Sequence, residues 1–169
     1  MELYIIEDYS ELFPDLRGKE LTDALVLDLL QKHGHLPSQD DGLPRILRLP
    51  GGKPVLSAGG IHFSVSHSGH IFACAVAEEN LGLDIQVSDG KDRTRLARRY
   101  FTQEEFQYIE DNGPASFYRL WTRKEAFSKF TGEGMAAVIG KTPVIGRQDV
   151  VFQDLVLDQG LYGCICTAR

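Results

Sequence analysis

Residues 117–130, FYRLWTRKEAFSKF, constrain the fold most, because they have the pattern of a helix that carries charge into a core. At helical spacing its large apolar side chains form one broad arc. Lys124 falls inside this arc, and Glu125 and Lys129 lie one turn apart just beyond its edge. A lysine among aromatic side chains is costly unless an anion meets it. We therefore expect an anion beside Lys124. The arc consists of Phe117, Leu120, Trp121, Phe127 and Phe130.

Two interpretations of these charged residues remain open. Glu125 could supply a hard oxygen ligand, and Lys124 and Lys129 two cations, for a metal-bound polyphosphate. Alternatively, Lys124 extends its ammonium group to water, and Glu125 and Lys129 form an ordinary surface pair. The helix alone does not decide between a site and a solvated face.

Three strand-like runs, at residues 61–66, 71–77 and 81–87, supply further polar groups. Alternation along the third run places Asp84 and Gln86 side by side on one face. Their oxygens could share a hard cation, although a polar edge facing solvent fits the same spacing. Ser66 and His67 stand at the end of the first run, where side chains and backbone N–H groups can converge on an anion. No GxSxG elbow accompanies them.

Helical patterns at residues 21–32, 103–109 and 117–130 alternate with strand patterns near both termini and in the middle of the chain. Residues 102–105, TQEE, supply a capping box for the second of these helices, Pro114 suits the first turn of the third, and a glycine-bearing exit at residues 131–134 ends it. Residues 71–76 and 161–166 also resemble each other, each combining aromatic, small and cysteine residues. We therefore predict an α+β fold with two similar lobes and a ligand cleft between them. Near residues 51–54, Lys53 lies between glycines and a proline. It could reach a phosphate from a rigid turn, or be an ordinary solvated lysine.

Composition excludes several classes of protein. The chain has 169 residues and a net charge of −6, which argues against broad affinity for nucleic acid. Its three cysteines form no CxxC pair, so neither a zinc site nor a disulfide framework is indicated. No apolar run reaches the length of a membrane span. We expect a soluble cytoplasmic protein with no nucleic-acid or membrane partner.

Four segments in order, GKP, FSVSHSG, GLDIQ and LWTRKEAFSKFTGEG, resemble the motif series of the 4′-phosphopantetheinyl transferases. The resemblance covers roughly residues 51–134 and is to the monomeric two-lobed type that activates peptide and polyketide synthetases. It implies two pseudo-symmetric lobes, at residues 1–83 and 84–169, each a small antiparallel sheet packed with a long helix. It also implies Mg²⁺-dependent transfer of the 4′-phosphopantetheine group of coenzyme A to a serine of an apo acyl or peptidyl carrier protein. Adenosine 3′,5′-bisphosphate would be released.

The resemblance assigns roles to residues on both sides of the predicted cleft. It implies that Lys53, Ser66 and His67 hold the nucleotide end of coenzyme A, with His67 near the 3′-phosphate. Asp84 and Glu125 would ligate Mg²⁺ on the pyrophosphate.

The same resemblance implies the catalytic groups. Glu125 would also be the general base for the carrier serine. Lys124 and Lys129 would neutralise charge on the phosphates, so Asp84, Glu125 and Lys129 form the implied catalytic set. The arginine-rich helix from Arg93 to Arg99 could dock an acidic carrier protein, or simply be a solvated charged face.

Two departures from the family pattern qualify these expectations. The second strand motif is usually GxDxE, and this chain has Gln86 at the last position. An amide oxygen can ligate Mg²⁺, or Mn²⁺, but with one negative charge fewer, so we predict weaker metal binding with activity retained. Basic residues for the coenzyme A phosphates are also hard to match near the N-terminus. The alternatives are a non-catalytic homologue that binds coenzyme A or a carrier protein, and a metal-dependent phosphodiesterase.

Overall fold

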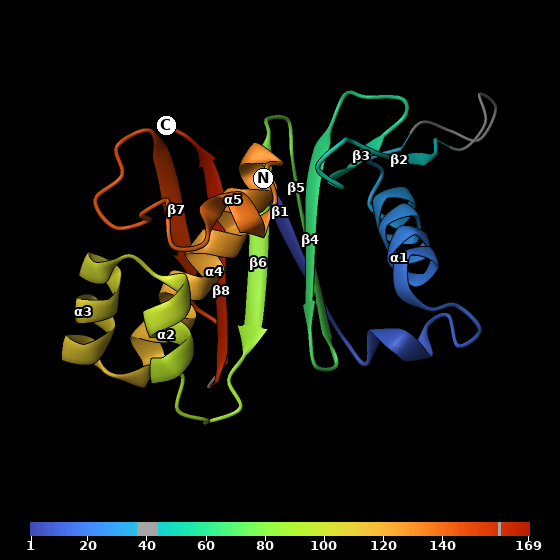
Figure 1. The fold of residues 1–169 in the computed structure, drawn as a ribbon. Coiled ribbons are helices and arrows are strands. Elements are labelled where there is room, and N and C mark those ends of the chain that lie inside the picture. The colour runs from blue at the N-terminus through green and yellow to red at the C-terminus, as the bar shows by residue number, and fades with distance from the viewer. Residues whose placement is uncertain (37–43, 159) are drawn as a thin grey trace.

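A computed structural model of the chain describes residues 1–36, 44–158 and 160–169 and has the predicted α+β architecture (Figure 1). Part of the predicted loop at residues 36–60 lies outside the described residues. The strands are β1 (Glu2–Glu7), β2 (Ile46–Arg48), β3 (Pro54–Leu56), β4 (His62–Ser68), β5 (Ile71–Ala77), β6 (Leu81–Val87), β7 (Val150–Leu155) and β8 (Leu161–Ala168). The helices are the 3-10 turn η1 (Tyr9–Glu11), α1 (Gly18–Lys32), α2 (Thr94–Tyr100), α3 (Gln103–Asn112), α4 (Pro114–Thr131) and α5 (Met135–Val138).

Two antiparallel three-stranded sheets have the same topology. Their strand orders are β1-β5-β4 and β6-β8-β7, and in each the first strand is followed by a helix and then by a hairpin whose last strand is central. The resemblance between residues 71–76 and 161–166 thus falls on β5 and β8, the two central strands. The division into lobes at residues 83 and 84 stays a prediction, and this position lies inside β6.

Polar side chains join the two sheets along β4 and β6, which lie side by side (Figure 1). The backbone N–H groups of Leu83 and Val87 donate to the hydroxyls of Ser64 and Ser68, both at 2.9 Å. Because donors and acceptors advance together along both strands, β4 and β6 run parallel. The serines therefore satisfy β6 backbone groups that face β4 and place a polar seam between the sheets.

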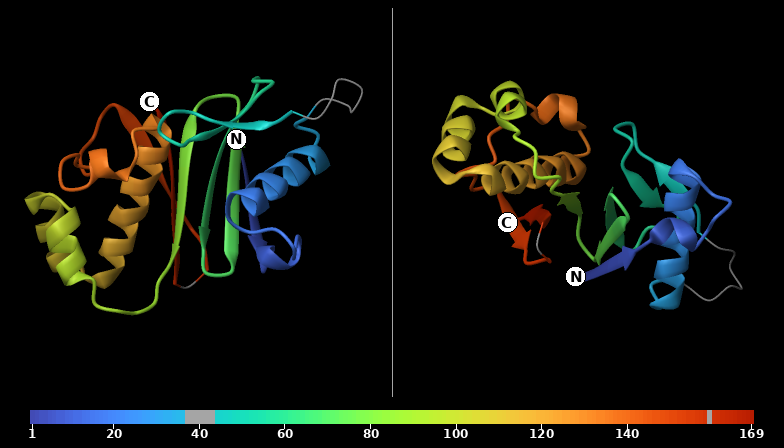
Figure 2. Two further views of the ribbon diagram at one scale, coloured as in Figure 1. Left: turned by 45° about the vertical axis from the view of Figure 1, so that its right-hand side comes forward. Right: turned by 90° about the horizontal axis from the view of Figure 1, so that it is seen from below.

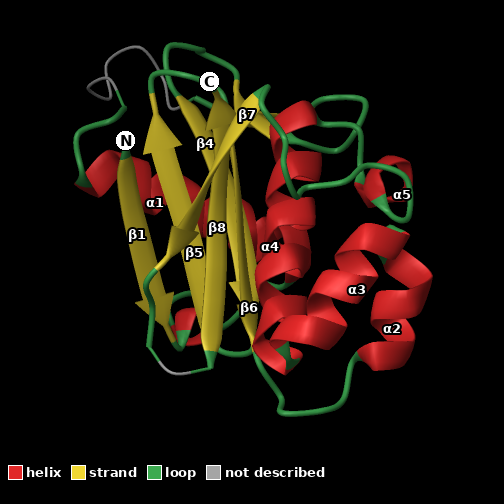
Figure 3. Cartoon of the chain, turned by 90° about the vertical axis from the view of Figure 1, so that its left-hand side faces the viewer, coloured by secondary structure: helices red, strands yellow, loops and turns green. Residues whose placement is uncertain are grey.

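Each sheet packs a helix on one face, as Figure 2 shows. Residues of α1, including Leu25 and Leu29, form one core with the sheet of β1, β4 and β5. A second core unites α4 with α2, α3 and β8, and a third lies between the two sheets. Figure 3 shows α4 running beside β6 and β8, with α2 and α3 beyond it.

The local signals that predicted the helices are largely confirmed. Thr102 and Glu105 form a capping box at the start of α3, and Pro114 occupies the first turn of α4. Gly132 ends α4 in the left-handed conformation. At Gly82 an added Cβ would lie 2.0 Å from the carbonyl oxygen of Ala126, so α4 can lie directly on β6 only because this position has no side chain. This close contact places the polar edge of α4 over the seam.

Candidate active site

The seam between β4 and β6 holds a buried carboxylate that is only half satisfied. Asp84 lies on β6 and is 4% exposed. Its Oδ1 atom accepts hydrogen bonds from the hydroxyl of Ser66 at 2.7 Å and from the ammonium group of Lys129 at 2.8 Å. Its Oδ2 atom is buried and has no hydrogen-bond partner among the described residues. An orphaned carboxylate oxygen is costly in a protein interior, which makes this atom a candidate for a ligand contact.

Glu125, one turn before Lys129 on α4, is electrostatically coupled to Asp84. The pKa of Glu125 is raised to about 7, chiefly by burial and secondly by the charge of Asp84, while Lys129 opposes the shift. Burial also raises the pKa of Asp84, despite the stabilising contacts from Lys129 and Ser66. Two coupled carboxyl groups whose pKa values are both raised by burial make Asp84 and Glu125 candidates for a functional site.

The available oxygen atoms suit a hard divalent cation. Gln86 lies two residues beyond Asp84 on the same face of β6, and its Nε2 atom donates to the hydroxyl of Ser68 at 3.2 Å. Its carbonyl oxygen is thereby left as an acceptor. No cluster of three histidine, cysteine, aspartate or glutamate residues that could hold a metal occurs within the described ranges. Two carboxylates and one amide nevertheless form an all-oxygen donor set of the kind that Mg²⁺ or Mn²⁺ accepts.

Lys124 lies in the core and does not face this cleft, contrary to the expected role in phosphate binding. Its side chain is fully buried, and its ammonium group lies 2.8 Å from the buried carboxylate of Glu105. It also donates to the carbonyl oxygen of Thr142 at 2.7 Å and lies 5.3 Å from the centroid of the Phe101 ring. The anion expected beside Lys124 is therefore Glu105, from the first turn of α3.

Glu105 is the important buried residue that sequence reasoning recognised only as a helix cap. Its Oε1 atom accepts from the backbone N–H of Val144 at 2.7 Å. Its Oε2 atom, which Lys124 contacts, also accepts from the backbone N–H and the hydroxyl of Thr102. Every oxygen of this carboxylate is thus paired. The signal in the sequence was the combination of a capping box with an unpaired lysine on the next helix.

Lys53 points to protein acceptors in this structure. Its ammonium group donates to the side-chain oxygen of Asn80, to the carbonyl oxygen of Leu81 at 3.0 Å and to that of Phe130 at 3.3 Å. An ammonium group has three N–H donors, so these contacts occupy all of them. Burial lowers the pKa of Lys53 to about 8. The rigid turn that the sequence predicts is present, but its lysine does not reach toward Asp84.

Ser66 and His67 do not converge, because neighbouring residues on β4 point to opposite faces. Ser66 is buried and donates to Asp84, whereas His67 is exposed and lies beside the ring of Tyr9, with 5.9 Å between centroids. The structure thus brings Ser66, but not His67, to the carboxylates.

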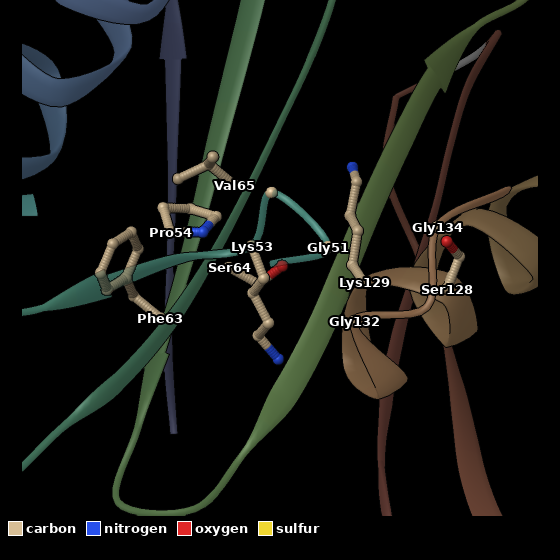
Figure 4. A pocket seen from close by; sticks show the side chains of 11 residues that line it. Gly51, Lys53, Pro54, Phe63, Ser64, Val65, Ser128, Lys129, Gly132 and Gly134 are labelled. Atoms are coloured by element: carbon tan, nitrogen blue, oxygen red, sulfur yellow. The ribbon is translucent and has the colours of Figure 1, made fainter. Parts of the chain in front are cut away.

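A cavity of about 250 Å³ lies beside Lys53 and Lys129 (Figure 4). Lys129 lies in its wall while its ammonium group holds Asp84, whereas Asp84 and Glu125 themselves are not lining residues. In Figure 4 the ammonium groups of Lys53 and Lys129 point in opposite directions. The lining residues come from the turn before β3, from β4 and from the end of α4: Gly51, Gly52, Lys53, Pro54, Phe63, Ser64, Val65, Ser128, Lys129, Gly132 and Gly134.

The arginines of α2 lie away from the cleft. Arg95, Arg98 and Arg99 are exposed, and the last two stack over the rings of Phe106 and Tyr100. Arg93, at the start of the helix, instead pairs with Asp89 at 2.7 Å. The helix therefore presents a basic surface, and among the described residues a carboxylate holds Arg93 at its N-cap but none of the three exposed arginines.

Taken together, the fold and the seam define an α+β protein with a buried, half-paired carboxylate and a second carboxyl group of raised pKa beside a lysine-bearing helix. Residues 80–153 match the model of the 4′-phosphopantetheinyl transferase superfamily. This segment contains Asp84, Gln86, Glu125 and Lys129. This match, together with the motif series and the relatives below, supports the assignment of the chain to this superfamily.

Named relatives extend the match beyond that segment. A Synechocystis sp. protein assigned as a 4′-phosphopantetheinyl transferase is 33% identical over 87% of this chain and 62% of its own length. The 4′-phosphopantetheinyl transferase psf-1 of Bacillus pumilus is 37% identical over 72% of this chain and 53% of its own. The 4′-phosphopantetheinyl transferase Sfp of Bacillus subtilis is 29% identical over 76% of this chain and 58% of its own length. The chain thus spans between half and two thirds of the length of these relatives.

Among the helices of the described residues, none combines the length and hydrophobicity that crossing a membrane requires.

Proposed function

We propose that this protein transfers the 4′-phosphopantetheine group of coenzyme A to a serine hydroxyl of an apo acyl or peptidyl carrier protein, with Mg²⁺ as cofactor. The observation that carries the proposal is the buried Oδ2 atom of Asp84, which has no partner in the described part of the chain and is electrostatically coupled to a glutamate whose pKa is raised to about 7. A divalent cation would satisfy both groups. The membership of the superfamily and the names of the relatives support the reaction.

The donor set fits a cation bound between the substrate's pyrophosphate and the seam. Asp84 and Glu125 would hold it through carboxylate oxygens and Gln86 through its amide oxygen, directly or through water. When bound, such a cation neutralises charge on the pyrophosphate oxygens during transfer. Lys129 lies within reach of the same region and would bind a phosphate oxygen once the cation takes over Asp84.

The chemical step is an attack of the carrier serine oxygen on the β-phosphorus of coenzyme A, which bears the pantetheine arm. A new serine O–P bond forms, and the bond from that phosphorus to the bridging pyrophosphate oxygen breaks. Glu125 accepts the serine proton on a carboxylate oxygen, the role that the family resemblance implies for it. The electron pair leaves with adenosine 3′,5′-bisphosphate, and Lys129 stabilises the charge that develops.

The test is intact-mass spectrometry of an apo carrier protein incubated with this protein, coenzyme A and Mg²⁺. Transfer adds one phosphopantetheine arm, roughly 340 Da from its covalent formula. The gain should disappear in Glu125→Gln, which keeps the size of the side chain. Several carriers from fatty-acid, polyketide and peptide synthesis should be tested in parallel. No gain on any of them would contradict the proposal.

A second candidate is a homologue that binds coenzyme A or a carrier protein without transfer. Gln86 favours it, because an amide replaces the carboxylate that the family pattern has at this position. The two functions differ in one measurement: binding of coenzyme A by calorimetry without any mass gain, unchanged in Gln86→Glu, supports the binder.

We further propose that the protein acts as a monomer and that the exposed face of α2, with Arg95, Arg98 and Arg99, docks an acidic carrier. Charge reversal at Arg95 should raise KM for the carrier while leaving that for coenzyme A unchanged. Equal KM values for the carrier in the variant and the native protein would remove this part of the proposal.

A further inference from the structure

We propose that Lys53 and Asn80 are positioning residues that clamp the C-terminal turn of α4 and thereby hold Lys129 in the active cleft. This inference rests on the proposed function for its kinetic consequence. It replaces the role that the family resemblance implied for Lys53, which was contact with the nucleotide.

The clamp converges on one carbonyl group. The oxygen of Phe130 accepts both from the ammonium group of Lys53 at 3.3 Å and from the side-chain amide of Asn80 at 2.9 Å. Asn80 also accepts from Lys53 through its side-chain oxygen. The three groups thus form a closed triangle. Phe130 follows Lys129 directly, so a hold on its carbonyl fixes the backbone from which Lys129 reaches Asp84.

The charge of Lys53 suits this place. The last carbonyl groups of a helix have no partners within the helix and carry the negative end of its dipole. A cation held there is stabilising, and the carbonyl oxygen of Leu81, 3.0 Å from the same ammonium group, connects the clamp to the start of β6. The clamp therefore joins the two elements that carry Asp84 and Lys129.

The turn that carries Lys53 is itself docked on α4. The N–H of Gly52 donates to the carbonyl oxygen of Leu49 at 2.7 Å, which closes a tight turn. At Gly51 an added Cβ would lie 1.7 Å from the carbonyl oxygen of Gly132, the residue that ends α4. This turn thus contacts the C-terminal end of α4 in two independent ways, through the backbone of Gly51 against Gly132 and through the side chain of Lys53. Both contribute to the wall of the cavity.

The test compares Lys53→Met, Asn80→Ala and the double variant with the native protein. If Lys53 and Asn80 form a clamp, each single variant should lower kcat for transfer roughly tenfold, because a misplaced Lys129 slows the reaction without weakening coenzyme A binding. The dissociation constant for coenzyme A, measured by calorimetry, should change less than about twofold. The double variant should be no worse than the worse single variant. Lys53→Arg should have most of the native rate, because it keeps the positive charge. Lys32→Met, which removes the lysine of an exposed ion pair with Asp28, is the control and should change neither kcat nor coenzyme A binding.

A ligand role for Lys53 gives the opposite pattern. Lys53→Met would then weaken coenzyme A binding, and Asn80→Ala would leave both binding and rate unchanged. This result would overturn the proposal. Asn80→Asp, which keeps the acceptor for Lys53 and loses the donor to Phe130, covers the case in which Asn80→Ala does not fold. It should lower kcat less than Lys53→Met does.

A second measurement needs no substrate. The N–H of Gly132 donates to the carbonyl oxygen of Ser128 at 2.9 Å, so its hydrogen exchange reports the stability of the last turn of α4. Exchange at Gly132 should become about fivefold faster in Lys53→Met and Asn80→Ala, as expected for the loss of one hydrogen bond. Unchanged exchange in both would overturn the clamp. If the native protein transfers nothing, the proposed function fails while this measurement still decides the clamp.

Discussion

Two lysines of α4 each pair with a buried acid, and the two pairs differ in whether the acid is fully hydrogen-bonded. Lys124 pairs with Glu105 at 2.8 Å, and Lys129, five residues later, pairs with Asp84 at the same distance. Both carboxylates are buried. They differ in what the second oxygen does: that of Glu105 accepts from Val144, whereas that of Asp84 has no partner among the described residues.

The difference teaches that pairing alone does not identify a functional residue. A complete set of partners makes the Glu105 pair a stabilising contact between α3 and α4. The incomplete set leaves Asp84 with a raised pKa and an oxygen available to a cation. The same type of ion pair therefore supports the core at one position and leaves a buried carboxylate oxygen open to a ligand at the other.

The strongest test of this comparison removes the structural acid. Glu105→Ala leaves the buried ammonium group of Lys124 without an anion, and breaking a buried pair in this way costs about 3–5 kcal/mol of unfolding free energy. Urea unfolding followed by circular dichroism measures the loss. Asp28→Ala, which breaks the exposed pair with Lys32, is the control and should cost about 0.5 kcal/mol or less. Similar losses in the two variants would show that Glu105 is not the anchor inferred here.

The next test removes the functional acid. Asp84→Asn should lower the rate of transfer by roughly two orders of magnitude or more, because a proposed cation ligand is lost. Its unfolding free energy should stay equal or rise, since a neutral amide avoids the cost of burying a half-paired carboxylate. Ser66→Ala, which removes one hydrogen bond and keeps the carboxylate, should lower activity far less. A loss of stability in Asp84→Asn as large as in Glu105→Ala would erase the distinction between the pairs.

The third test uses pH. The folded pKa of Glu125, about 7, lies above the ordinary 4.5, so this group stabilises the fold at low pH and loses that contribution as pH rises through about 7. Urea unfolding without metal should therefore show stability falling between pH 4.5 and 7 more steeply in the native protein than in Glu125→Gln. Mg²⁺ should restore stability above pH 7. Parallel pH profiles of the two proteins would contradict the burial of a charged Glu125.

Transfer should follow the same titration in the opposite direction. The rate depends on ionised Glu125, so kcat/KM measured at limiting Mg²⁺ should rise through about pH 7 and remain high above it. Saturating Mg²⁺ should move this rise to lower pH, because a bound cation favours the carboxylate. A profile that is independent of Mg²⁺ would place the base elsewhere.

The sequence predicted the elements well because their signals are local. The capping box at Thr102, the proline at the start of α4 and the alternation that aligns Asp84 with Gln86 each depend on neighbours within one turn or strand. The fold class followed from these patterns. The short strand β3 and the short helix α5 were missed, since so few residues carry little periodicity.

The partners of the lysines were not predictable in this way. The helical arc shows that Lys124 needs an anion, but only the packing of α3 against α4 supplies Glu105. The resemblance implies that Lys53 holds the nucleotide end of coenzyme A, and the sequence gives no sign of its protein partners Asn80, Leu81 and Phe130, which come from segments far apart in the chain. Side-chain partners distant in sequence are set by tertiary structure, which motif spacing does not encode.

The smallest expected effect concerns the amide in the candidate cation site. Gln86→Glu adds one negative charge beside Asp84, which should tighten Mn²⁺ binding about tenfold in a calorimetric titration of the protein alone. The same change should lower the Mg²⁺ concentration that gives half-maximal transfer. Gln153→Glu, at an exposed position on β7 in the same sheet, adds the same charge away from the site and should leave both values unchanged. Equal metal affinity in Gln86→Glu and the native protein would exclude Gln86 from the cation site and leave Asp84 and Glu125 as its only side-chain ligands.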